Sequence, residues 1–208
     1  MNSQVRGYLF GAIGVLCFSL TLPATRFAVQ DIDPMVVASG RAVIAAALAF
    51  LTLWVNHAAI PARHQWPSLA LVAGGAVIGF PAFTSWAMAH VDASHGAIVL
   101  GMLPLSTACF AVWVGHERPS FTFWVSALIG SLFVVGYSVQ QARGHFALYD
   151  LILLGAVASA GMAYAVGARL AKSLGSWQVI CWALVLSAPL VLPFLLFRLQ
   201  QVGFNPGT

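Results

Sequence analysis

The stretch at residues 93–119, ASHGAIVLGMLPLSTACFAVWVGHERP, decides the fold of this chain. It carries no Asp, Glu, Lys or Arg before Glu117, and it exceeds the roughly 20 apolar residues that cross a bilayer. Gly101 and Pro104 stand near its middle. A helix breaker inside a bilayer is tolerated where protein or a cavity satisfies the freed backbone groups. We therefore expect an interrupted membrane helix that forms part of a cavity wall.

The composition of the whole chain supports a membrane location. Of its 208 residues, 61% are hydrophobic and only 7% are charged, whereas a soluble domain carries about 25% charged residues. These charges are too few to cover a soluble surface, so lipid must surround most of the chain. The net charge is +4, but no run of Lys and Arg is present, which argues against nucleic acid as a partner.

The apolar runs predict an all-α integral membrane protein with about seven transmembrane helices. The expected spans are residues 7–25, 34–55, 68–89, 93–115, 121–139, 148–170 and 177–197. The connections between them are short and hold most of the charges. The four-residue connection at residues 90–93 predicts that the third and fourth spans form an antiparallel hairpin.

The distribution of Lys and Arg predicts the orientation, because cytoplasmic loops carry an excess of both. An N-terminus on the inner side leaves five basic residues inside and three outside. The five are Arg6, Arg63, Arg118, Arg169 and Lys172, and the three are Arg26, Arg143 and Arg198. This distribution favours an inside N-terminus, and seven spans then leave the C-terminus outside.

A short internal similarity predicts a repeat. Gly11-Ala12-Ile13 in the first span matches Gly155-Ala156-Val157 in the sixth, about 144 residues later. The separation is five spans, and an odd number inverts the second copy in the membrane, as in many transporters. We expect a first repeat at residues 7–139 and a partial second repeat at residues 148–208. Three further spans would then be expected beyond the last residue given.

Four groups of residues carry a family resemblance. They are Arg26 with Asp33-Pro34 and ASGR at 38–41; SWAMA at 85–89 with Ala93 and Ala97; LPL at 103–105 with GHERP at 115–119; and Gly130 with Gly136. In this order and spacing they resemble the drug/metabolite transporter superfamily, specifically its EamA-type ten-helix members. The resemblance covers residues 7–139 as one complete unit and residues 148–197 as the start of a second.

The resemblance implies a multi-pass protein of the cell (inner) membrane. It would export small metabolites, such as amino acids, by alternating access about a cavity between the two units. Its partners would be a small-molecule substrate and the lipid bilayer, with no cofactor and no metal. The shorter length leaves open a truncated fragment that does not transport.

Arg41 is the candidate with the most costly position, about two turns into the second span. A charge there costs about 2.5 kcal/mol on insertion scales. It could anchor a carboxylate or phosphate of the substrate. Alternatively, it reaches the outer interface or pairs with Asp31 or Asp33.

Other candidates are polar or aromatic residues placed to line a cavity. Ser19 and Thr21 lie beside Pro23, which predicts a broken first span or an ordinary kink. The complete set of expected substrate-binding residues is Ser19, Thr21, Arg41, Trp86, Pro104, Thr107 and Tyr164. Five other tryptophans, Trp54, Trp66, Trp113, Trp124 and Trp177, fit an interfacial belt. Small residues around Gly75, Gly79 and Ser159 predict close helix packing.

We expect no carboxylate inside any span. The small multidrug exporters of the same superfamily place a Glu in their first helix, so its absence disfavours a lipophilic-cation exporter. Three cysteines, Cys17, Cys109 and Cys181, have no paired spacing and are interpreted as small core residues.

Two other classes of protein remain as alternatives. An intramembrane enzyme could use His90, Asp92 and His95 as a metal triad or proton relay, although Asp and Ser also cap helices in a hairpin turn. A seven-helix receptor has the right number of spans. However, the seventh span lacks the Lys that would form a retinal-type Schiff base in such a receptor. The sequence also lacks the GxSxG and HExxH motifs, which disfavours the enzyme.

Overall fold

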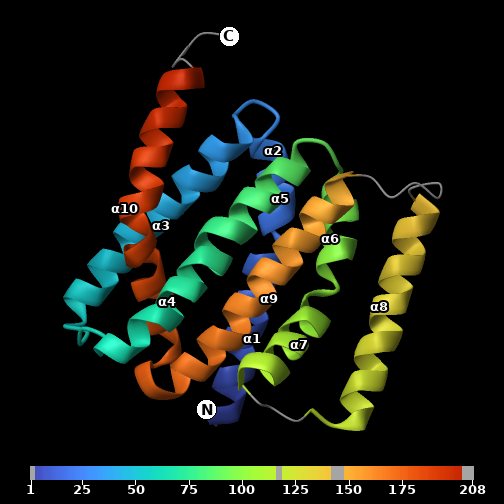
Figure 1. Cartoon of the computed structure of the whole chain (residues 1–208), viewed down its shortest axis with the longest axis horizontal. Helices are drawn as coiled ribbons and strands as arrows, with labels where there is room; N and C mark the ends of the chain where they lie inside the picture. The colour runs from blue at the N-terminus through green and yellow to red at the C-terminus, as the bar shows by residue number, and fades with distance from the viewer. Residues whose placement is uncertain (1–2, 116–118, 142–147, 203–208) are drawn as a thin grey trace.

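The computed structural model describes residues 3–115, 119–141 and 148–202. Its elements in order are α1 (Ser3–Ser19), α2 (Thr21–Ala28), α3 (Pro34–Val55), the 3₁₀ turn η1 (Arg63–Gln65), α4 (Trp66–Val72), the π-helical segment η2 (Ala73–Gly79), α5 (Phe80–Met88), α6 (Ala93–Leu100), α7 (Leu103–Gly115), α8 (Phe121–Gln141), α9 (Leu148–Leu174) and α10 (Ser176–Val202). The helices run up and down in one bundle (Figure 1).

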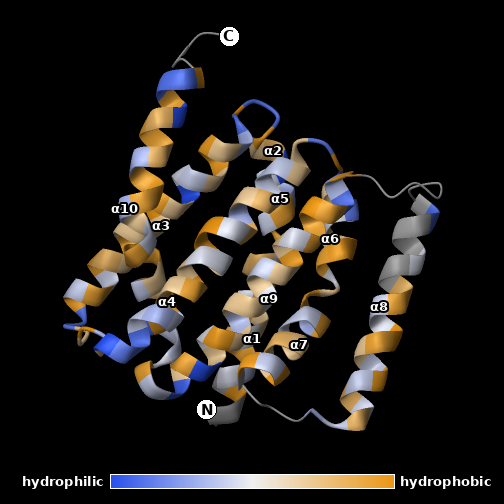
Figure 2. Ribbon diagram, viewed as in Figure 1, coloured by the Kyte–Doolittle hydropathy of each residue, from blue (hydrophilic) through white to orange (hydrophobic). Residues whose placement is uncertain are grey.

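The helices have the length and composition of membrane spans. Among the described residues, six helical segments are long and apolar enough to cross a bilayer, and α8 contains a shorter apolar stretch, Phe121–Phe133. Apolar residues dominate the middle of the bundle, and polar residues gather at its two ends (Figure 2). The prediction of an all-α integral membrane protein with about seven spans is confirmed.

The two ends of the bundle are named by the helices that meet there (Figure 1). At the inner end, α3, α7 and α9 finish and α4, α8 and α10 begin; at the outer end, α2, α5 and α10 finish and α3, α6 and α9 begin. These names follow the orientation expected from Lys and Arg. Arg118 and Arg143, which contributed to that expectation, lie outside the described residues, as does the side chain of Arg6.

The fourth span is interrupted where the sequence predicts. Helix α6 ends at Leu100, and α7 begins at Leu103. The Gly101 N–H donates to the carbonyls of both Ala97 (3.1 Å) and Ile98 (2.9 Å), so the last turn of α6 tightens. Pro104 is the second residue of α7, where a missing N–H removes no helical bond. The break therefore leaves α6 as a separate eight-residue helix.

The first span is broken as well. Helix α1 ends at Ser19, and α2 begins at Thr21. Pro23 is the third residue of α2, within the first turn, which a proline tolerates. The Ser19 Oγ donates to the carbonyl of Leu16 at 2.8 Å and satisfies one acceptor at the end of α1.

The third span contains a feature that the sequence did not reveal. Between α4 and α5, the segment Ala73–Gly79 is a π-helix, a form usually found as a single turn within an α-helix. Gly75 lies against α9, where Ser159 Oγ donates to its carbonyl at 3.0 Å. A Cβ on Gly75 would come within 2.5 Å of the Ser159 carbonyl oxygen. Close packing between these small residues, which the sequence predicts, therefore depends on glycine.

Helix α9 forms the centre of the bundle. It packs against α4, η2, α5, α6, α7 and α10, and Leu153, Ala156 and Ala160 are almost fully buried. On the α7 side, Ser106 Oγ donates to the Val157 carbonyl at 3.1 Å, and a Cβ on Gly161 would meet Ser106. Helix α8, by contrast, packs mainly against α6 and α7.

Two groups of residues, the cysteines and the tryptophans, include exposed side chains. Cys17 and Cys109 are exposed and Cys181 is partly exposed, so their interpretation as core residues is wrong for the first two. The five tryptophans expected in an interfacial belt, Trp54, Trp66, Trp113, Trp124 and Trp177, all lie near helix termini at the inner end. Trp54, Trp113 and Trp177 are exposed there, as side chains at a membrane–water interface require.

Candidate functional site

A cavity with a volume of about 870 Å³ lies beside the interrupted fourth span. Helices α6 and α7 supply one wall, and side chains from α1, α8 and α9 complete it. Its lining includes Phe18, Gly101, Pro104, Thr107, Ala111, Phe123 and Tyr164. Since Phe123 belongs to the first turn of α8, the cavity extends from the middle of the bundle to its inner end.

A smaller cavity of about 260 Å³ adjoins it on the outer side. Phe18, Leu100 and Gly101 line both cavities. Ser19 and Thr21, at the break between α1 and α2, line the smaller one. Both broken spans therefore meet at the junction of the two cavities.

Five of the seven expected substrate-binding residues converge on these cavities. Pro104, Thr107 and Tyr164 line the larger cavity, while Ser19 and Thr21 line the smaller. The remaining two, Arg41 and Trp86, line neither of them.

Arg41 lies on α3 and faces α2. Its Nη1 donates to Thr25 Oγ1 at 3.4 Å, and it forms no ion pair with Asp31 or Asp33, which was one of the alternatives left open by the sequence. Asp33 binds Arg198 instead. Trp86 is 45% exposed on α5, and its carbonyl accepts from His90 Nδ1 at 3.1 Å.

The cavity offers mostly apolar surface with a few hydroxyl groups. Thr107 Oγ1 donates to the Leu103 carbonyl at 2.9 Å, which leaves its oxygen free to accept. The Tyr164 phenol can donate and accept. No charged side chain is among the described residues that line either cavity. This lining suits a small ligand with an apolar part and a few polar groups, as in most small-molecule sites.

A buried carboxylate contradicts one expectation from the sequence. Asp150 is the third residue of α9 and is only 6% exposed, and its Oδ1 lies 2.6 Å from Nε2 of His95 on α6. The expectation of no carboxylate inside a span is therefore wrong. Its place in the first turn of a helix was a usable signal, because the N-terminal dipole favours a carboxylate there.

In the structure, His90, Asp92 and His95 do not form a group that could hold a metal ion. Each side chain has a different partner: His90 stacks on Tyr149 with ring centroids 4.4 Å apart, Asp92 faces Arg26 at 3.8 Å, and His95 binds Asp150. Within the described part of the chain, no group of three His, Cys, Asp or Glu side chains could hold a metal ion. Asp92 occupies the N-cap position of α6 but makes no side-chain capping bond.

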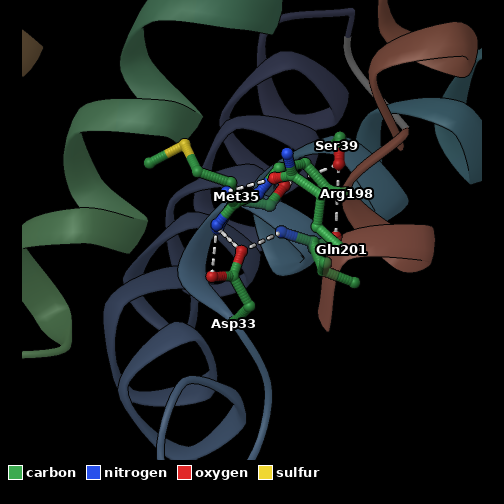
Figure 3. Close-up of polar contacts among 6 residues, drawn as sticks. Asp33, Met35, Ser39, Arg198 and Gln201 are labelled. Carbon is green, nitrogen blue, oxygen red and sulfur yellow. Dashed lines mark hydrogen bonds and ion pairs between the residues drawn. The ribbon is translucent and has the colours of Figure 1, made fainter. Parts of the chain in front are cut away.

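Another ion pair joins α3 to α10 at the outer end (Figure 3). Asp33 Oδ1 accepts from the backbone N–H groups of Met35 (2.9 Å) and Val36 (3.1 Å) and so caps α3. Its Oδ2 lies 2.6 Å from Nη2 of Arg198, which also donates from Nη1 to Gln201 Oε1 at 3.3 Å. The pair links residues 165 positions apart, a separation that local sequence patterns do not report.

Two arginines make the same kind of contact at opposite ends. Arg26 Nη1 donates to the Met88 carbonyl at 2.6 Å, at the end of α5. Arg169 Nη1 donates to the Val114 carbonyl at 2.9 Å, near the end of α7. Carbonyls in the last turn of a helix lack helical donors, so each guanidinium satisfies one of them and ties two helices together.

Comparison with known proteins agrees with this architecture. The EamA-like transporter family matches residues 5–139. The chain is 46% identical to the "Uncharacterized transporter YdeK" of Bacillus subtilis (strain 168) over 197 residues, which cover 95% of this chain and 69% of that protein. No solved structure matches the chain.

The family match, the relative and the apolar helices lead to one assignment. The chain is a multi-pass protein of the cell membrane. It belongs to the EamA-like transporter family.

Proposed function

We propose that the protein is a secondary transporter that exports small metabolites, such as amino acids, by alternating access. The observation that carries this proposal is the pair of adjoining cavities at the two broken spans, where five expected site residues converge. The largely apolar lining with hydroxyl groups favours a neutral or zwitterionic substrate over a free cation, because no described carboxylate faces either cavity.

The proposal includes the inverted repeat suggested by the sequence. Residues 7–139 would form the first unit, and residues 148–208 the first part of the second. Helix α9 would then be the first helix of the second unit, and its Tyr164 completes a cavity otherwise lined by α1, α6, α7 and the start of α8. A site between the two units fits the usual construction of transporters with inverted repeats.

The position of the cavity also suggests a direction of access. The larger cavity reaches Phe123 at the inner end, whereas side chains paired between helices cross the outer end. We infer that this arrangement receives substrate from the inner side. The interruption at Gly101 and Met102 would let α6 move separately from α7 when the outer side opens, as hinges at element ends do.

The first test measures counterflow of radiolabelled amino acids into proteoliposomes that contain the protein. Ala111→Phe places a large ring in the cavity and should lower the initial rate at least about fivefold, the equivalent of about 1 kcal/mol, because the ring fills volume that the substrate would occupy. Ala47→Phe is the matched control, because Ala47 is exposed on α3. Equal rates for the wild type and Ala111→Phe would contradict the assignment of this cavity.

A second pair of variants tests whether the Thr107 hydroxyl contacts the substrate. Thr107 and Thr52 each donate to the carbonyl four residues earlier, at 2.9 and 2.8 Å, but only Thr107 lines the cavity. Thr107→Val should raise the KM of a hydroxyl-dependent substrate about two- to tenfold, the range expected for one neutral hydrogen bond, while Thr52→Val should not. The same KM for both variants would remove Thr107 from the substrate site.

A further inference from the structure

A separate polar pocket lies at the inner end of the bundle. It has a volume of about 300 Å³ and lies where α4 begins and α7 and α9 end. Its polar lining consists of His64, Gln65, Ser68, Arg169 and Ser173. None of these residues lines the two cavities assigned to transport. A volume of this size is at the lower limit for small-ligand pockets and can hold one small polar group.

The pocket combines a fixed cation with hydroxyl, amide and imidazole groups. Arg169 gives one N–H to the Val114 carbonyl, which positions the guanidinium and leaves four of its five donors for other partners. Gln65 is held at both ends: its Oε1 accepts from the Ala62 N–H at 2.9 Å, and its Nε2 donates to Ser173 Oγ at 3.2 Å. A positioned guanidinium beside hydroxyl groups is a preferred arrangement for binding a phosphate group.

The distribution of charge adds to this chemistry. The carboxylates that the structure describes are Asp31, Asp33, Asp92 and Asp150, and all four lie at the outer end. Arg63 and Arg169 lie at the inner end. Arg169 lines the pocket and supplies a positive charge there, which attracts anions.

The depth of the pocket matches that of lipid headgroups. The five tryptophans at the inner end include Trp54, Trp113 and Trp177, which are exposed. Tryptophan side chains of membrane proteins concentrate at the level of the headgroups. Basic pockets between transmembrane helices at the cytoplasmic side bind the headgroups of anionic lipids.

We propose that this inner pocket binds a phosphate group, carried either by an anionic phospholipid or by a soluble ion. Arg169 supplies the charge, and His64 and Ser68 lie beside the phosphate oxygens. The site is distinct from the transport cavity, so its occupancy stabilises the junction of α4, α7 and α9 whether or not substrate is present. The proposal goes beyond the proposed transport function and does not depend on it.

The experiment measures the thermal unfolding midpoint of the purified protein in neutral detergent micelles. Phosphatidylglycerol, phosphatidylcholine and inorganic phosphate are titrated separately, because a ligand that binds only the folded state raises the midpoint. A saturable rise with phosphatidylglycerol alone identifies the lipid as the source, and a rise with inorganic phosphate identifies a soluble ion. If none of the three raises the midpoint, or if phosphatidylcholine raises it as much as phosphatidylglycerol, the proposal is wrong.

Matched variants connect the effect to the pocket. Arg169→Gln should weaken the apparent affinity at least about tenfold, as expected for a charge-assisted hydrogen bond. Arg26→Gln is the control, because Arg26 makes the same carbonyl contact at the outer end, away from the pocket. Ser68→Ala leaves the contact between Arg169 and Val114 in place and should weaken the affinity about two- to tenfold. Unchanged affinity in both Arg169→Gln and Ser68→Ala would overturn the proposal.

Discussion

The outer and inner ends of the bundle are held together in different ways. At the outer end, side chains pair across helices: His95 with Asp150 between α6 and α9, and Asp33 with Arg198 between α3 and α10. At the inner end, Arg169 and Gln65 join helices through a carbonyl and a hydroxyl. The large cavity approaches the inner end, not the outer one.

The two ends therefore differ in how their helices are joined. Asp33 and Arg198 form an ion pair at the outer end and His95 and Asp150 a close contact, and a charge inside a membrane is retained when it has a partner. The inner end has a cavity beside helices that are joined through single hydrogen bonds. Four sets of substitutions test this contrast.

The largest effect is expected for Asp150→Ala. Removing the carboxylate leaves His95 without its partner between α6 and α9, and breaking a buried pair costs about 3–5 kcal/mol. The free energy of unfolding in mixed micelles containing a denaturing detergent measures the loss. Asp31→Ala at the same end is the control, because the Asp31 side chain is exposed, and it should change stability by less than about 0.5 kcal/mol. A similar small value for Asp150→Ala would show that the outer end is not held by this pair.

The second largest loss of stability is expected for Gly161→Ala, in the middle of the bundle. The added Cβ would collide with Ser106 on α7, whose backbone cannot move without separating α7 from α9. Overpacking of this kind costs about 1–3 kcal/mol. Gly40→Ala places the same methyl group in a helix with no neighbouring atom within 4 Å, and it should be neutral or stabilising. Equal unfolding free energies for the two variants would show that α7 and α9 are not in close contact.

Asp33 permits a finer test, because it caps α3 and also binds Arg198. Asp33→Asn keeps an oxygen for the N–H groups of Met35 and Val36 but removes the charge, and it should cost about 1 kcal/mol. Asp33→Ala removes the cap as well and should cost about 1 kcal/mol more. Unfolding of Arg198→Gln alone and combined with Asp33→Asn gives the coupling energy of the pair. A coupling energy of zero would show that Asp33 stabilises the protein only as the cap of α3, and not through Arg198.

The smallest effect is expected for Asp92→Asn. Asp92 faces Arg26 at 3.8 Å, but its side chain is 84% exposed, and exposed pairs contribute about 0–1 kcal/mol. Stability should fall by no more than about 0.5 kcal/mol, and the difference should vanish in high salt. A loss as large as that of Asp33→Asn would mean that exposure does not separate the two pairs.

The sequence predicted the spans well because their determinants are local. Residues 34–55 were predicted residue for residue, since Asp33 and Pro34 mark the start of the helix and the apolar run ends at Val55. The interruption of the fourth span followed from Gly101 and Pro104. Five expected site residues line the cavities for the same reason, because four of them lie at or beside a predicted break.

The pairings between distant segments could not be predicted in this way. His95 and Asp150 are 55 positions apart, and Asp33 and Arg198 are 165 apart, so no local pattern connects them. Proximity in the sequence left pairing of Arg41 with Asp31 or Asp33 as one alternative, but Asp33 caps α3 and binds Arg198. Helix packing, not spacing along the chain, decides these contacts.

The π-helical segment Ala73–Gly79 has a consequence for the evolution of the third span. A π-turn holds one more residue than an α-turn, so the segment behaves like a one-residue insertion. Each residue of an α-helix turns the chain by about 100°, and the wider π-turns absorb the additional residue, so that α5 continues in phase with α4. Deleting one residue here, with a return to α-helical turns, would keep the buried Thr84 and Ser85 toward the core and the exposed Trp86 on the outside. The π-helical segment thus allows the third span to hold one more residue without turning the faces of α5.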